Sequence, residues 1–166
     1  MEGTLPTKAS AFVIVKRRDG AFLCTLEGDG EIGVPGGKWE PERDGFSWDR
    51  LAAREYEEEV GAPLPTPVSA GYLEWGSDAY QVRFKVLTVS DGVADGIPTG
   101  PSSDPDGAVH EVFWVRPEVL RKRRVRAHVK TALDVLNSFK IIAREAERRP
   151  RTASYSGYTL EDALGW

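Results

Sequence analysis

Short segments of alternating hydrophobic and polar residues recur along the first two thirds of the chain, and this pattern predicts β-strands. The turn sequence RRDG at 17–20 separates the first two segments, as in a β-hairpin. The dipeptide Arg116-Pro117 ends the last segment, because proline has no backbone N–H to donate. The predicted strands are 9–15, 21–26, 68–75, 80–89 and 109–115, with a short strand or loop at 33–39.

Two segments have helical periodicity instead. Ser47 is a predicted N-cap, Asp49 follows in the first turn, and Gly61 ends the helix after Val60. A long amphipathic helix is predicted from about Val125, with apolar positions at Val129, Ala132, Leu133, Leu136, Phe139 and Ala143. The order of strands and helices predicts an α/β fold with a mixed sheet and helices on both sides.

The connecting segments differ in composition. A Pro-rich link at 63–67 excludes continuation of the first helix, and 90–108 is rich in Gly, Pro, Ser and Asp, which predicts a long loop. We interpret residues 1–149 as one domain and 150–166 as a C-terminal tail. The tail either is disordered or docks on a domain, and Thr159 with Asp162 is a candidate cap for one short turn.

Composition narrows the class of protein. The sequence of 166 residues is 40% hydrophobic, which is enough for one domain with a core. No run of 18 apolar residues and no signal peptide is readable, and Cys24 has no second cysteine to pair with. We therefore expect no membrane association and a cytoplasmic protein. The oligomeric state is open, with a homodimer as one candidate.

Charge is unevenly distributed. The segment from Val109 to Arg151 contains twelve Lys and Arg residues and only five acidic residues, although the net charge of the chain is −4. The run RKRRVR at 121–126 is a candidate RNA-binding segment, because clustered cations attract phosphates. A solvated helix start explains the same run, and no aromatic residues interleave with it as a single-strand binding surface requires.

Glutamates crowd the end of the first predicted helix. Glu55 lies beside both Glu58 and Glu59, because positions three and four apart are neighbours on a helix. Like charges at this spacing repel each other, whereas oxygen ligands suit Mg²⁺ or Mn²⁺. The cluster therefore predicts a divalent-metal site.

The stretch from Gly36 to Ala62 resembles the signature of the Nudix hydrolases. We call this stretch of residues the box. In that signature a glycine and a distant Glu precede the pattern Arg-Glu-apolar-x-Glu-Glu-x-Gly-apolar. The second half is filled position by position by Arg54, Glu55, Tyr56, Glu57, Glu58, Glu59, Val60, Gly61 and Ala62. The resemblance covers roughly residues 8–140 and implies a Nudix-type α/β/α sandwich.

The first half of the box departs from the signature. The spacing from Gly37 to Arg54 is three residues longer than usual, and Phe46 stands where a Glu is expected to pair with Arg54. A buried guanidinium without a carboxylate partner is costly, so an acidic residue of the lengthened loop should replace that Glu. The candidates are Glu42 and Asp44, followed by Glu40.

The resemblance also implies roles for individual residues. The implied metal ligands are the side chains of Glu55, Glu58 and Glu59 and the backbone carbonyl of Gly36, with Glu111 as a further ligand and Asp104 and Asp106 as second choices. Either Glu55 or Glu58 accepts a proton from the attacking water, and Arg54 orients the glutamates.

The predicted reaction is metal-dependent cleavage of a pyrophosphate bond in a nucleoside diphosphate linked to another group. Nucleoside triphosphates and dinucleoside polyphosphates are the leading substrates, and capped RNA and nucleotide-sugars are alternatives. A catalytically silent module that binds a nucleotide or RNA is the competing class. The candidate substrate-binding residues are Gly37, Lys38, Trp39, Tyr72, Trp75 and Tyr80.

Overall fold

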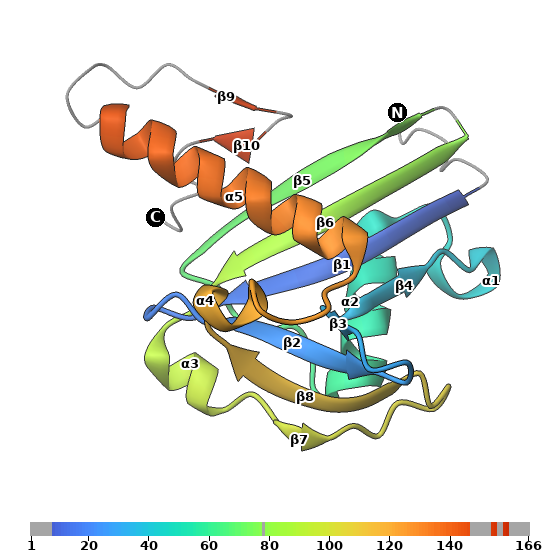
Figure 1. Ribbon diagram of the computed structural model, residues 1–166. Coiled ribbons are helices and arrows are strands. Elements are labelled where there is room, and N and C mark those ends of the chain that lie inside the picture. Colours follow the sequence, from blue (N-terminus) through green and yellow to red (C-terminus); the bar gives the residue numbers. More distant parts are fainter. Residues whose placement is uncertain (1–7, 78, 147–153, 156–157, 160–166) are drawn as a thin grey trace.

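The computed structural model describes residues 8–77, 79–146, 154–155 and 158–159 (Figure 1). Its main sheet has eight strands in the order β5-β6-β1-β2-β8-β7, with β3 paired to β2 and β4 paired to β1. Strands β1 and β6 are parallel, and the other pairs are antiparallel, so the sheet is mixed. The strands are β1 (Lys8–Lys16), β2 (Phe22–Glu27), β3 (Ile32–Gly33), β4 (Gly36–Lys38), β5 (Ser69–Ser77), β6 (Tyr80–Thr88), β7 (Gly100–Pro101) and β8 (Val109–Val115).

The sheet forks beside β1. Strand β2 pairs with the end of β1 at Lys16, whereas β4 pairs with its first half, where Phe12 lies opposite Gly36. The segment between β3 and β4 runs through this fork, and its Pro35 carbonyl accepts a hydrogen bond from Val13 N at 2.8 Å. The first half of the box is therefore built into the centre of the sheet.

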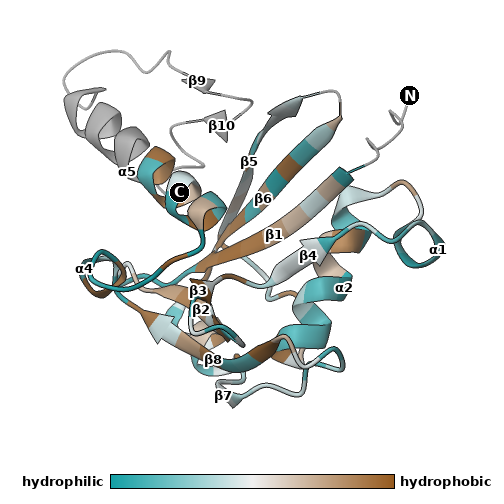
Figure 2. Ribbon diagram, turned by 45° about the vertical axis from the view of Figure 1, so that its right-hand side comes forward, coloured by the Kyte–Doolittle hydropathy of each residue, from teal (hydrophilic) through white to brown (hydrophobic). Residues whose placement is uncertain are grey.

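One long helix covers each face of the sheet. Helix α2 (Trp48–Val60) packs on the face that carries Val13 and Leu23, and α5 (Ala127–Ala146) packs on the opposite face, against Phe84 and Cys24. Figure 1 shows α5 in front of the sheet and α2 behind it. Figure 2 shows that β1 between them is largely hydrophobic, whereas α1 (Pro41–Asp44) at the edge is hydrophilic. The predicted α/β/α sandwich with a mixed sheet is confirmed.

The ends of α2 follow the sequence signals. The Ser47 side chain accepts a hydrogen bond from Arg50 N at 3.2 Å, and Gly61 adopts a left-handed conformation with φ of 83°. A serine N-cap contributes roughly 1 kcal/mol, and glycine ends a helix without the strain that a side chain brings to positive φ. These two residues fix which turns of α2 carry the glutamates.

The segment 90–108 was predicted as a loop, and this prediction was incomplete. It contains α3 (Asp91–Asp95), whose N-cap Ser90 accepts from Val93 N, and β7, which pairs with β8. After β8, Pro117 begins α4 (Pro117–Leu120) instead of only ending the strand. The basic residues 121–124 lie in the turn between α4 and α5, because α5 begins only at Ala127.

Part of the predicted tail forms a two-stranded antiparallel pair, β9 (Ser154–Tyr155) with β10 (Tyr158–Thr159). Thr159 is therefore in a strand, and the short turn that it was predicted to cap with Asp162 lies in 160–166, outside the described residues. The side chains of Phe139 and Ala143 also lie outside the described part of α5. None of the described helices is long and apolar enough to span a membrane.

Candidate functional site

Helix α2 presents two glutamates to the sheet beside its apolar contacts. Its buried residues include Tyr56 and Val60, which pack in the core on that face. Glu55 and Glu59 lie on the same side, one turn apart, and are only 9% and 7% exposed. The helix therefore holds two carboxylates in a partly desolvated position next to β4.

The paired glycines of β4 receive these carboxylates. Gly36 N donates a hydrogen bond to Glu59 Oε2 at 3.2 Å. A Cβ atom at Gly37 would lie 2.5–2.7 Å from the carboxylate atoms of Glu55, and one at Gly36 would lie 2.4 Å from the Ala11 carbonyl oxygen. A side chain at Gly36 would collide with backbone, and one at Gly37 would displace the Glu55 carboxylate, so the two glycines allow β4 to approach the glutamates closely.

Gly37→Ala should reduce activity at least tenfold, because the new methyl group would displace the Glu55 carboxylate. A tenfold loss corresponds to about 1.4 kcal/mol of transition-state stabilisation. The measurement is kcat/KM on the best substrate. Gly92→Ala is the matched control, since a Cβ at Gly92 in α3 meets no atom within 4 Å. Equal activity of the two variants would contradict the close packing at Gly37.

Arg54 is held by Asp44 of the lengthened loop. Its Nε and Nη2 donate to the two Asp44 oxygens at 2.6 and 2.9 Å, and Asp44 is fully buried. Burial opposes the charge of Asp44, yet the hydrogen bonds from Arg54 and from Glu40 N keep its pKa below the usual value. The predicted replacement of the missing Glu is confirmed with Asp44 as the partner; Glu42 is exposed and does not take part.

Arginines also hold the outer glutamate of the cluster. Glu58 accepts a hydrogen bond from Arg54 Nη1 at 3.3 Å and forms an ion pair with Arg43 of α1. Arg54 Nη1 lies 3.0 Å from Glu55 Oε1 as well. The loop between β4 and α2 thus supplies Asp44, which fixes the guanidinium of Arg54. It also supplies a second guanidinium, that of Arg43.

Burial opposes ionisation of the two inner glutamates. The pKa of Glu55 is raised to about 7, mainly by burial, with the charge of Arg54 opposing the shift. The pKa of Glu59 is raised to about 9 by burial and by the neighbouring charge of Glu55. A bound cation would relieve both effects, because it favours the ionised form of each carboxylate.

The donor set fits a hard divalent cation by its chemistry. As placed, no three acidic, His or Cys side chains of the described residues form a closed metal site. Glu58 is instead turned to its arginines, while Glu55 and Glu59 face the Gly36–Gly37 backbone. Carboxylates with a backbone carbonyl are the ligands that Mg²⁺ and Mn²⁺ take, together with water.

The predicted further ligand Glu111 does not join this group. It lies opposite Leu26 in the β2–β8 pair, two residues from the Cys24–Phe113 pair. Side chains alternate along a strand, so Glu111 lies on the sheet face that α5 covers, away from α2.

Glu27 and Asp104 lie close enough to Glu59 to raise its pKa. Asp104 was a second choice from the sequence. Glu27 was missed, although its place directly after an apolar strand was a usable signal.

Two of the predicted substrate-binding residues, Lys38 and Trp39, lie where β4 leads into the lengthened loop. Lys38 is exposed at the end of β4, and its carbonyl accepts from Arg54 Nη2 at 3.3 Å. The indole of Trp39 donates to the Gly45 carbonyl at 2.6 Å and packs against the core under α2. Trp39 therefore supports the lengthened loop, and Lys38 remains a candidate for contact with phosphate.

The other three predicted aromatic residues do not form one platform. Tyr72 lies on the α2 side of β5, with the Arg83 guanidinium 4.8 Å from its ring centroid. Trp75 packs on the opposite face and stacks on Phe84 at 5.3 Å. Tyr80 is exposed at the start of β6. The structure separates Tyr72 from Trp75, because positions three apart on a strand lie on opposite faces.

Comparison with known proteins identifies the fold. No protein-family model and no curated protein matches the sequence. Among solved structures, a Nudix hydrolase from Nitrosomonas europaea is 19% identical with a TM-score of 0.50, and the match covers 92% of this chain and 99% of that one.

Two further matches carry more specific names. A bifunctional NMN adenylyltransferase/ADP ribose pyrophosphatase from Francisella tularensis, complexed with AMP and Mn, is 15% identical with a TM-score of 0.59; the match covers 80% of this chain and 42% of that one. The Ap4A hydrolase of C. elegans is 17% identical with a TM-score of 0.51, and the match covers 80% and 97%. The chain has the fold of the Nudix hydrolases.

Proposed function

We propose that the chain is a metal-dependent hydrolase that cleaves a pyrophosphate bond in a nucleoside diphosphate linked to another group. The observation that supports this most is the placement of Glu55 and Glu59, which are buried against the Gly36–Gly37 backbone in a Nudix fold. Burying carboxylates in this way is unfavourable without a compensating cation. The retention of all three box glutamates favours an enzyme over a silent binding module.

In this proposal each box residue has a defined task. Glu55, Glu58, Glu59 and the Gly36 carbonyl hold Mg²⁺ or Mn²⁺. A bound cation neutralises pyrophosphate oxygens and lowers the pKa of the attacking water. Either Glu55 or Glu58 accepts the proton of that water. Arg54, fixed by Asp44, holds the Glu55 and Glu58 carboxylates in position beside Gly36 and Gly37 of β4.

The substrates that we propose first are nucleoside triphosphates and dinucleoside polyphosphates. Nucleotide-sugars and capped RNA come next. Proteins with this fold include one named as an Ap4A hydrolase and one named as an ADP ribose pyrophosphatase. The first name supports a dinucleoside polyphosphate as substrate, and the second supports a nucleotide-sugar. Lys38 at the mouth of the loop is the residue proposed to contact the phosphates.

A panel of these compounds tests the reaction class. Each is incubated with the protein in Mg²⁺, in Mn²⁺ and in excess chelator, and the products are separated. We expect release of a nucleoside monophosphate, phosphate or pyrophosphate only with metal. Turnover of no compound in either metal, with retained binding of a nucleotide, would favour the silent module instead.

Divalent cations should also stabilise the protein without substrate. At a metal concentration about 100 times Kd, selective binding to the folded state contributes about 2.7 kcal/mol, which raises Tm by roughly 5–10 °C for a domain of this size. We expect Glu59→Gln to lose most of this rise, whereas the exposed Glu57→Gln keeps it. Equal melting temperatures of the parent with metal and with chelator would contradict the metal site.

A further inference from the structure

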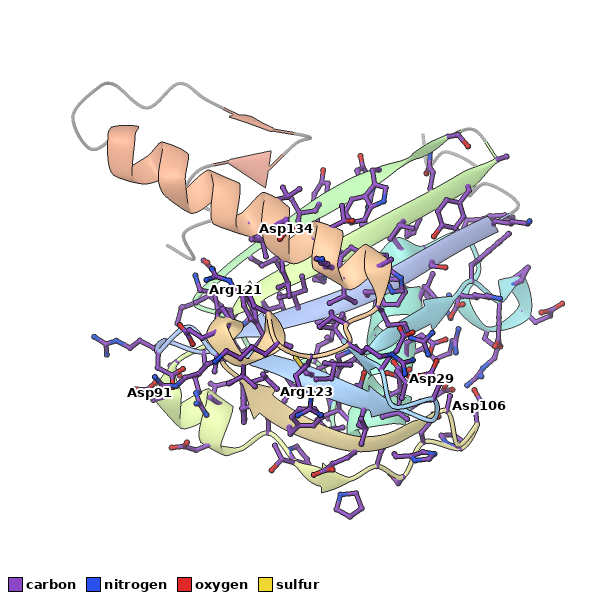
Figure 3. The ribbon with its side chains drawn as sticks, viewed as in Figure 1. Asp29, Asp91, Asp106, Arg121, Arg123 and Asp134 are labelled. Carbon is purple, nitrogen blue, oxygen red and sulfur yellow. The ribbon has the colours of Figure 1, made fainter. Side chains whose placement is uncertain are left out.

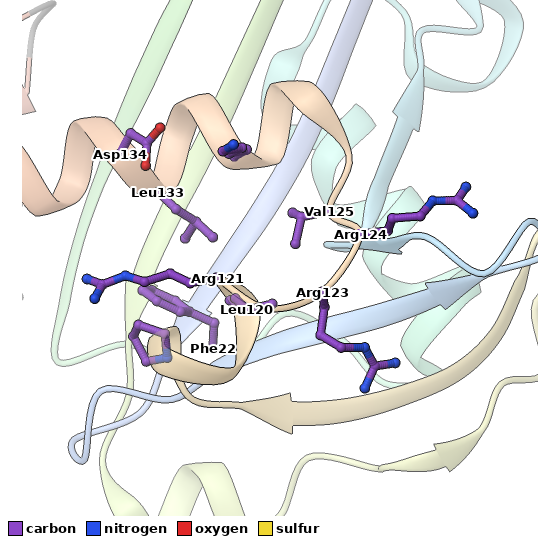
Figure 4. A pocket seen from close by; sticks show the side chains of 10 residues that line it. Phe22, Leu120, Arg121, Arg123, Arg124, Val125, Leu133 and Asp134 are labelled. Atoms are coloured by element: carbon purple, nitrogen blue, oxygen red, sulfur yellow. The ribbon is translucent and has the colours of Figure 1, made fainter.

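A hollow separate from the box lies beneath the turn between α4 and α5. Its volume is about 310 Å³. Figure 4 shows its apolar wall, which includes Phe22 of β2, Leu120 of α4, Val125 of the turn and Leu133 of α5. This volume is at the lower end of the range for small-molecule pockets, which runs from roughly 300 to 1,000 Å³.

Cations surround this apolar wall. Arg121, Arg123, Arg124 and Lys130 line the hollow together with a single acidic residue, Asp134. Within the described part of the chain, Arg121 and Arg123 form no ion pair, and Arg124 pairs only with Glu31 at 3.2 Å. The guanidinium groups are exposed and extend in different directions around the mouth (Figure 4). The charges of Arg121 and Arg123 are therefore available to an external anion.

The turn that carries these cations is fixed to the sheet. Ile32 N donates to the Arg124 carbonyl at 2.8 Å, and Arg126 N donates to the Ile32 carbonyl at 2.9 Å. Val125 between them packs against the core under α5. These contacts hold the part of the wall that the turn contributes in place against the sheet.

The hollow lies away from the box glutamates. In Figure 3, Arg121 and Arg123 lie beside α4, whereas Asp29 and Asp106 lie at the other end of β2 and β8. The box glutamates lie on the α2 face of the sheet, while Phe22 and Val125 belong to the core under α5. A ligand in the hollow would thus occupy a second site.

We propose that this hollow binds a small organic phosphate whose apolar or aromatic body enters between Phe22 and Leu133 while its phosphate meets the arginines. Arginine suits this partner because its planar fork donates two hydrogen bonds to one phosphate. The apolar wall favours a small ligand over RNA, since single-stranded RNA binds through exposed aromatic residues that this turn lacks.

Binding of 1-naphthyl phosphate tests the proposal, because this probe joins an aromatic body to a phosphate and has no pyrophosphate bond. Calorimetry in excess chelator compares it with inorganic phosphate and with 1-naphthol. We expect naphthyl phosphate to bind at least tenfold more tightly than either part alone. AMP and octyl phosphate then distinguish a nucleotide from a lipid-derived phosphate as the natural form of the ligand.

Variants locate the binding. Arg121→Ala combined with Arg123→Ala should weaken the affinity for naphthyl phosphate at least tenfold, and Leu133→Trp, which fills the hollow, should abolish binding. Lys8→Ala combined with Arg18→Ala is the matched control, because it removes two exposed cations outside the hollow. Unchanged affinity in both hollow variants would overturn the proposal. Tight binding of an RNA oligomer without preference for naphthyl phosphate would also overturn it.

Discussion

The Glu58→Gln variant should lose at least a hundredfold in kcat/KM and keep its fold. Glutamine keeps the size of the side chain and one of the two oxygens that accept from Arg43 and Arg54, but it replaces the other oxygen by an NH₂ group and removes a negative charge that the cation needs. A hundredfold loss corresponds to about 2.7 kcal/mol of transition-state stabilisation. Steady-state kinetics at saturating Mg²⁺ measures the loss, and circular dichroism checks the fold.

The neighbouring Glu57→Gln is the control for this variant. Glu57 lies on the same turn of α2 and carries the same charge, but it is exposed and outside the proposed ligand set. We expect its activity to stay within about threefold of the parent, equal to less than about 0.7 kcal/mol. Activity of Glu58→Gln within the same range would show that Glu58 does not hold the metal.

Replacement of Asp44 by alanine is expected to be the most destabilising single change in the lengthened loop. It leaves the guanidinium of Arg54 without its two shortest hydrogen bonds in a largely buried position. Breaking a buried ion pair in this way costs about 3 kcal/mol, which lowers Tm by roughly 6–12 °C for a domain of this size. Urea denaturation gives the free energy of unfolding directly.

Glu42→Ala provides the comparison in the same short helix. Glu42 is exposed, and substitutions at such positions change stability by about 0.5 kcal/mol or less. If Asp44→Ala unfolds at the same urea concentration as Glu42→Ala, the Arg54–Asp44 pair does not brace the loop. In that case Arg54 would depend on Glu58 and Glu55 alone.

Local signals in the sequence were sufficient for most elements. Ser47 and Gly61 mark the two ends of α2, because a cap and a left-handed glycine act within a few residues of the helix end. The last strand, 109–115, was predicted with its observed limits, since Val109 begins its alternation and Pro117 stops it. The placement of Glu55 and Glu59 on one side of α2 followed from helical spacing, whereas the turn of Glu58 towards Arg43 did not.

Contacts between distant segments were less accessible to sequence reasoning. Glu111 was expected near the box because it precedes an aromatic strand end, but the sheet face of a residue depends on strand register, here its pairing with Leu26. Tyr72 and Trp75 were separated for the same reason. The approach of Arg43 to Glu58 depends on α1, a four-residue helix whose sequence carries little periodicity.

In the box, the carboxylate partner of Arg54 comes from a different position than the signature predicts. Phe46, which occupies the position of the expected Glu, is 56% exposed, and its ring centroid lies 6.0 Å from that of Trp39. Asp44, two residues earlier, reaches Arg54 because α1 turns the lengthened loop back towards α2. The electrostatic requirement of a buried guanidinium predicted that a replacement exists, and the structure identifies it.

Hydrolysis in ¹⁸O-labelled water is the most direct test of the proposed reaction. Mass spectrometry of the products from the best nucleotide substrate shows whether water attacks phosphorus. The proposed function predicts one ¹⁸O atom in a phosphate-containing product, formed only when Mg²⁺ or Mn²⁺ is present and at least a hundredfold more slowly with Glu58→Gln. Product formation that continues unchanged in excess chelator, or products without the label, would contradict a metal-dependent pyrophosphohydrolase.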